Sequence, residues 1–76
     1  MTNKLPKITA AEVIKVLEKI GFLISRQSGS HKIYKNMEGK RTTVPYHAGK
    51  ILHSKILKSI LRDINLTIDE FKELMK

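Results

Sequence analysis

The segment Gly29-Ser30-His31, followed by Lys32 and Lys35, combines residue types that suit chemistry on a phosphodiester. An imidazole takes up and releases protons near neutral pH, so it can act as a general base or a general acid. Lysines close by can offset the negative charge that develops on a reacting phosphate. The pattern therefore predicts a proton-transfer role for His31, and we favour that of the base.

A structural role for His31 is the competing interpretation. Strand alternation places His31, Ile33 and Lys35 on one face, so the ring could shelter beside a core isoleucine. Most histidines in small domains have no catalytic task, and spacing alone favours this structural interpretation over catalysis.

Positive charge is concentrated in the middle of the chain. The net charge is +8, and nine of the 15 basic residues lie between Arg26 and Arg62, where Glu38 is the single acid. The remaining segments are neutral overall. A field concentrated in this way attracts polyanions, so nucleic-acid contact is favoured over a basic face that serves only solubility.

Further residues extend the candidate site. His47 could supply a complementary acid, hold a loop or meet phosphate. A basic stripe at i, i+3, i+7 spacing, Lys55, Lys58 and Arg62, could contact RNA, meet an acidic protein or face solvent. Tyr34 could stack on a base or pack at a sheet edge. The candidate RNA-binding residues are Ser30, Lys32, Lys35, Arg41, His47, Lys55 and Lys58.

No metal or other cofactor is expected. His47 and His53 are six residues apart, which matches no helical ligand pair, and Glu38 is the one carboxylate in the basic middle of the chain. Two-metal nucleases need clustered acids. We expect His53 to pack or to cap a helix.

Helix signals flank the basic segment. A capping box begins a helix at Thr9–Ile20, and Gly21 ends it. Ser54 is the expected N-cap of a second helix that ends at Asn65. A second capping box, starting at Thr67, begins a short final helix.

Three short segments between these helices are typical of strands, at 22–27, 31–36 and 41–44. The turns between them are short, so the strands should form an antiparallel meander. The predicted order is α-β-β-β-α-α, an α+β domain with the helices on one face of a three-stranded sheet.

Size and composition predict a single domain spanning residues 1–76. The chain has no cysteine, which excludes disulfides, thiolate nucleophiles and cysteine-ligated zinc. Met1–Pro6 has no apolar stretch of the signal-peptide type, and no run approaches membrane-spanning length. We therefore expect a cytoplasmic protein.

Four motifs, in this order and at this spacing, resemble those of the HicA toxins, the mRNA interferases of HicA–HicB toxin–antitoxin pairs. The resemblance runs from about Thr9 to Leu74, and it departs from the family at His53–Ile56, where many members have proline or glycine. The motifs are Gly21-Phe22, Arg26-Gln27-Ser28-Gly29-Ser30-His31, Thr43-Val44-Pro45-Tyr46-His47 and Ile60-Leu61-Arg62.

This resemblance implies a fold like that of double-stranded-RNA-binding domains and an endoribonuclease that cleaves mRNA without the ribosome. The family's essential histidine maps onto His31, and the implied partner is a HicB antitoxin that covers the active site. Two alternatives remain: a non-catalytic RNA-binding module that uses the same sheet and basic helix, and a degenerate toxin that serves only its antitoxin.

Overall fold

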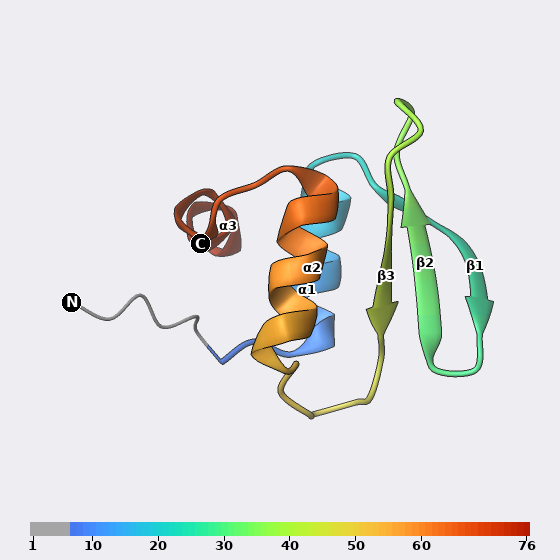
Figure 1. The fold of residues 1–76 in the computed structure, drawn as a ribbon, viewed down its shortest axis with the longest axis horizontal. Coiled ribbons are helices and arrows are strands. Elements are labelled where there is room, and N and C mark those ends of the chain that lie inside the picture. Colours follow the sequence, from blue (N-terminus) through green and yellow to red (C-terminus); the bar gives the residue numbers. More distant parts are fainter. Residues whose placement is uncertain (1–6) are drawn as a thin grey trace.

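Three antiparallel strands form one open sheet in the order β1-β2-β3 (Figure 1). The strands are β1 (Leu23–Ser28), β2 (His31–Lys35) and β3 (Arg41–Pro45). They belong to a computed structural model that describes residues 7–76. The predicted meander is confirmed, and the expectation for Met1–Pro6 lies outside the described residues.

Three helices complete the predicted α-β-β-β-α-α order, so the α+β class is confirmed. They are α1 (Ala10–Lys19), α2 (Ser54–Ile64) and α3 (Ile68–Met75). The helices lie on one side of the sheet, and α3 packs beside α1 (Figure 1). The opposite face of the sheet carries no helix of the described residues. Within residues 7–76, no helix combines the length and the apolarity needed to cross a membrane.

Both predicted capping boxes are present. The Thr9 amide donates to Glu12 Oε1 at 2.8 Å, and the Glu12 amide donates back to Thr9 Oγ1 at 3.3 Å. Thr67 and Glu70 repeat the arrangement at 2.8 and 3.1 Å. Asn65 ends α2 with a φ of 59°, the left-handed conformation expected there. These local signals set the helix boundaries: the capping boxes satisfy amides that the first turn leaves free, and the Asn65 amide donates to carbonyls of the last turn.

The predicted N-cap of α2 is wrong by one residue. His53 occupies the cap, and its Nδ1 accepts a hydrogen bond from the Lys55 amide at 3.1 Å, so Ser54 is the first helical residue. The Leu52 amide donates to the Ile8 carbonyl at 2.8 Å, which ties the chain to the start of α1 just before the cap. The capping role expected of His53 is therefore confirmed.

The core lies between the sheet and the helices, and Tyr34 is the residue through which β2 joins it. Tyr34 is 4% exposed, so base stacking by Tyr34 is excluded. Burial, and secondarily the negative charge of Glu18, raise the pKa of the Tyr34 hydroxyl. The buried apolar residues are Ile8, Ala10, Val13, Val16, Leu17, Phe22, Tyr34, Val44, Leu57, Ile60, Leu61, Ile64 and Phe71.

The two outer strands differ in their contact with the helices. Thr42 of β3 is buried, and its hydroxyl donates to Asp63 Oδ2 of α2 at 3.0 Å. Every residue of β1 is exposed, and its pairing with β2 is irregular between Ile24 and Arg26. β3 therefore anchors the sheet to the helices, whereas β1 extends beyond them.

Candidate active site

The turn between β1 and β2 sets the position of His31. Gly29 and Ser30 form a two-residue hairpin loop between Ser28 and His31, which are paired across the strands. Gly29 has a φ of +59°, as hairpin turns of this length require. The Ser30 carbonyl accepts a hydrogen bond from the Tyr46 amide at 2.7 Å. The turn is thus held by β1 on one side and by the end of β3 on the other.

Replacing Gly29 with alanine should destabilise this turn by about 1–2 kcal/mol, because the left-handed backbone crowds a Cβ against its own carbonyl. An added methyl group would meet no neighbouring atom within 4 Å, so backbone strain alone is the expected cause. Urea unfolding measures the loss. Ser30→Ala is the matched control, since Ser30 has no positive φ and its backbone bond survives. Equal stability of the Gly29→Ala variant and the wild-type protein would contradict the expectation.

His31 is exposed and, by strand alternation, lies on the face of β2 opposite the buried Tyr34, the face that no helix of residues 7–76 covers. Its cross-strand partner is Pro45, and Ile33 pairs with Thr43 on the same face. The core side of β2 is taken by Tyr34, so Ile33 does not belong to the core. The interpretation that His31 shelters beside a core isoleucine is therefore wrong. An exposed imidazole on an uncovered face is accessible to a large substrate.

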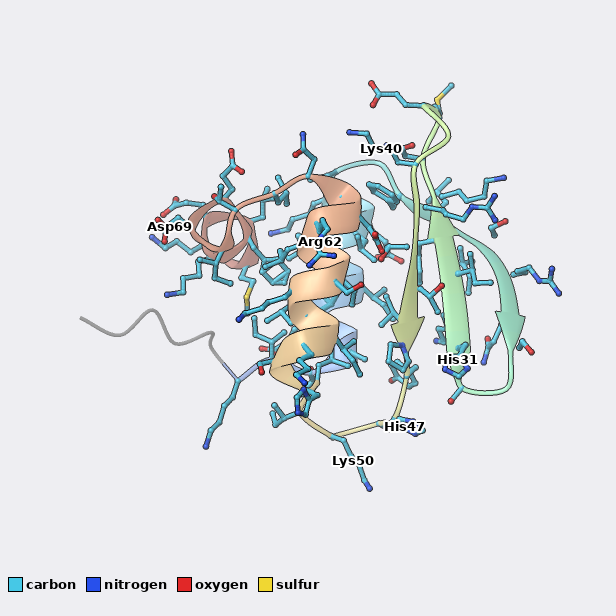
Figure 2. All side chains as sticks on the ribbon, in the orientation of Figure 1. His31, Lys40, His47, Lys50, Arg62 and Asp69 are labelled. Atoms are coloured by element: carbon cyan, nitrogen blue, oxygen red, sulfur yellow. The ribbon has the colours of Figure 1, made fainter. Side chains whose placement is uncertain are left out.

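His47 lies at the same end of the sheet as His31 (Figure 2). It is exposed and follows Pro45, the partner of His31, by two residues. The Tyr46 amide still bonds to Ser30, so the strand-like pairing continues to the residue before His47. The structure thus brings the two histidines of the sequence motifs to one end of β2 and β3.

A hollow of about 250 Å³ adjoins this end of the sheet. Its walls are mainly apolar, and three of the residues that line it, His47, Lys50 and His53, carry side-chain nitrogen atoms. Sequence reasoning missed the loop residues Lys50–Leu52, because no periodic pattern marks an irregular loop as a wall of a cavity. The lining residues are Pro45, His47, Lys50, Ile51, Leu52, His53 and Ile56.

Two of the predicted RNA-binding residues share the open face with His31. Lys35 and Arg41 are exposed and lie directly opposite each other across β2 and β3. Arg26 also lies on this face, opposite Ile33, although it is not among the residues expected from the sequence to bind RNA. Arg26 could have been predicted from the hairpin register, because counting back along β1 from the Ser28–His31 pair places Arg26 opposite Ile33.

Lys32 lies on the other face of the sheet. It is paired with Val44, a core residue, and its Nζ stands 4.1 Å from the centre of the Tyr46 ring. This position suits a cation–π contact. Neighbouring residues of a strand point to opposite faces, so the structure separates Lys32 from His31 despite their adjacency in the chain.

Lys55 and Lys58 belong to a third location. Both are exposed on α2, as is Arg62, and helical spacing puts them on the side of the helix away from the core residues Leu57 and Ile60. The predicted RNA-binding residues therefore fall on separate surfaces, and the α2 stripe does not share a face with His31.

The described residues contain no group of three histidine, aspartate or glutamate side chains placed to hold a metal ion. Within residues 7–76, the one ion pair joins Lys76 to Glu73 at 3.1 Å, on α3 and its C-terminal end. The cations beside His31 consequently have no acidic partner in the described part of the chain, and they are available to an external anion.

Comparison with known protein families gives one match. A family model described as the HicA toxin of bacterial toxin–antitoxin systems matches residues 10–66. The matched stretch holds α1, the three strands and α2, and therefore the histidines at the end of the sheet. No curated protein matches the chain.

Proposed function

Because the chain belongs to the HicA toxin family of bacterial toxin–antitoxin systems, we propose that it is a metal-independent endoribonuclease that cleaves mRNA at a site centred on His31. The observation that carries this proposal is the position of His31: exposed, at the start of β2, on a hydrogen-bonded turn and an uncovered sheet face. A histidine that served only to pack the core would be buried, whereas His31 is exposed.

RNA supplies its own nucleophile, the 2′-hydroxyl, so the protein needs to move protons and to stabilise charge. In the proposed reaction, His31 accepts the proton of the 2′-hydroxyl as its oxygen bonds to phosphorus. The bond from phosphorus to the 5′-oxygen breaks, and that oxygen takes up a proton. The products carry a 2′,3′-cyclic phosphate and a 5′-hydroxyl.

His47 is the candidate donor of the second proton, because it is exposed at the same end of the sheet as His31. Lys32 points to the other face of the sheet, so a different cation must stabilise the negative charge on the phosphorane. Lys50 is the candidate, since it borders the hollow that His47 also lines and lies at this end of the molecule (Figure 2).

A 2′-deoxy substitution at the cleavage site should block the reaction, because the nucleophile is then absent. The measurement compares an RNA oligonucleotide with the same oligonucleotide carrying one deoxynucleotide 5′ to the scissile phosphate, both in excess chelator. We expect fragments from the first and none from the second. Cleavage of the deoxy substrate, or loss of all cleavage in chelator, would contradict the proposed mechanism.

A toxin of this family acts with an antitoxin partner, and we propose that the partner of this chain is a HicB-like protein that covers His31. The supporting feature is the set of exposed cations without acidic partners beside His31 in the described residues, which suits an acidic partner surface. Because mRNA is the proposed substrate, the site of action is the cytoplasm.

A non-catalytic RNA-binding module is the second candidate function. It is favoured by the exposed basic stripe of α2, which lies apart from His31 and can contact phosphate without cleavage. A purified protein that shifts the mobility of RNA but leaves it intact would support this alternative.

A further inference from the structure

We propose that the open face of the sheet is the track for single-stranded RNA, with Arg26, Lys35 and Arg41 as phosphate-binding residues that lead the backbone to His31. The inference rests on the proposed function and specifies where its substrate lies. It assigns the substrate to the sheet rather than to the basic stripe of α2.

The distribution of charge between the layers is the first argument. None of the three strands contains an acidic residue. The acids of residues 7–76 lie on the helices, apart from Glu38 in the turn between β2 and β3. The helical layer therefore mixes charges, whereas the sheet presents cations alone, which is the complement of a phosphate backbone.

The strand register is the second argument. Lys35 and Arg41 are direct cross-strand partners, and like charges in this position destabilise a sheet. A bound anion between them removes that repulsion. Lys35 follows His31 by four positions on one strand, a span of about 13 Å at the usual rise per residue. Arg26 lies between these ends, opposite Ile33.

The uncovered face also offers contacts for sugars and bases. Ile33 is half-buried, Leu23 is 69% exposed opposite Lys35, and Thr43 adds an exposed hydroxyl. Apart from the His31 ring, the strands place no aromatic side chain on this face on which bases could stack. Binding on this surface should thus depend on phosphates and show little preference for base.

The basic stripe of α2 lacks the features that favour the sheet. Arg62 is directly followed by the acid Asp63, and the exposed stripe lies on the side of α2 away from the buried residues Leu57 and Ile60. RNA held along the stripe would lie on a different face of the molecule from His31. We therefore infer that the stripe does not carry the reacting strand.

The test compares two variants that lose the same charge, Lys35→Gln with Arg41→Gln on the sheet, and Lys55→Gln with Lys58→Gln on α2. Both are made in the His31→Ala background, so that binding is measured without cleavage. Fluorescence anisotropy with a labelled oligouridine gives the affinity over a range of salt concentrations. Each lost phosphate contact lowers the slope of log K against log salt by about 0.7 for single strands, so the sheet variant should lose about 1.4.

The helix variant should keep the slope of the His31→Ala parent. A slope lowered in the helix variant but unchanged in the sheet variant would overturn the proposal, as would equal losses in both, since equal losses mean that only net charge matters. Undiminished binding of RNA by the sheet variant, with binding of an acidic partner lost, would assign the face to a protein instead. Thermal unfolding is the folding control: the sheet variant removes a like-charge pair, so its melting temperature should not fall.

The catalytic role of His31 and the RNA track on the sheet can be refuted independently of each other. If His31→Ala cleaves RNA as the wild type does, the catalytic proposal fails, while the salt slopes still decide the track. If the sheet variant binds RNA with an unchanged slope, the track fails, while the cleavage assay still decides the role of His31.

Discussion

Replacing His31 with alanine should abolish RNA cleavage and leave the fold and RNA binding mostly intact. The side chain is exposed and makes no hydrogen bond in the described residues, so its removal leaves no cavity and no unpaired group. A general base contributes about 10²–10⁴-fold to a reaction of this kind. Incubation of a long single-stranded RNA with the wild-type protein and the variant, both in chelator, measures the loss directly.

Lys32→Ala is the matched control for this experiment. It changes the adjacent residue on the same strand, yet Lys32 lies on the opposite face over the Tyr46 ring. We expect this variant to retain cleavage within a few-fold of the wild-type rate. Cleavage by His31→Ala at the wild-type rate would remove His31 from the mechanism. Intact RNA with every protein, together with a salt-sensitive mobility shift, would support the binding-module alternative.

Local chemistry made much of the fold predictable. Thr9 and Thr67 were recognisable as caps because the side chain and the amide that it satisfies lie three residues apart, within one turn. Asn65 was recognisable as a helix end because its short polar side chain tolerates the left-handed conformation. Ser54 was wrongly preferred as the N-cap of α2, because the His53 ring nitrogen accepts the amide hydrogen bond that the Ser54 hydroxyl was expected to accept.

The orientation of the sheet was harder to predict than its existence. Alternation in β2 separates His31 and Ile33 from Tyr34, but it does not say which set faces the helices. The answer depends on β3, where Thr42 pairs with Tyr34 and is buried with it under α2. This is a tertiary contact between distant segments, so periodicity within one strand could not supply it.

The two histidines of the candidate site were predicted from the sequence, but the residues that surround them were not all predicted correctly. His31 and His47 were found from their motifs, and the structure brings them to one end of the sheet. The residues around the two histidines depend on strand pairing. Lys32 lies on the other face of the sheet, whereas Arg26 of the neighbouring strand lies on the same face as His31. Proximity in sequence is a poor guide within strands, because adjacent side chains diverge.

Replacing Phe71 with alanine should remove a large part of the stability of the protein, because α3 completes the core from outside the stretch that matches the family model. The Phe71 side chain is 0% exposed, and truncating a buried phenylalanine costs about 3–5 kcal/mol. At about 0.05–0.15 kcal/mol per residue, a chain of 76 residues has a stability of about 4–11 kcal/mol, so the loss is a large part of the total. Urea unfolding followed by circular dichroism measures the change.

Lys72→Ala supplies the control, since it alters the next residue of α3 on its exposed side. If Phe71→Ala is too unstable to study, Phe71→Leu should fold with a smaller loss of stability and a lowered urea midpoint. The helix is also held to α1 by the Lys19 ammonium, which donates to the Leu74 carbonyl at 2.6 Å and to the Lys76 carbonyl at 3.2 Å. An unchanged midpoint in Phe71→Ala would mean that α1, α2 and the sheet form a self-sufficient core. The burial of Phe71 among residues of that core argues that they do not.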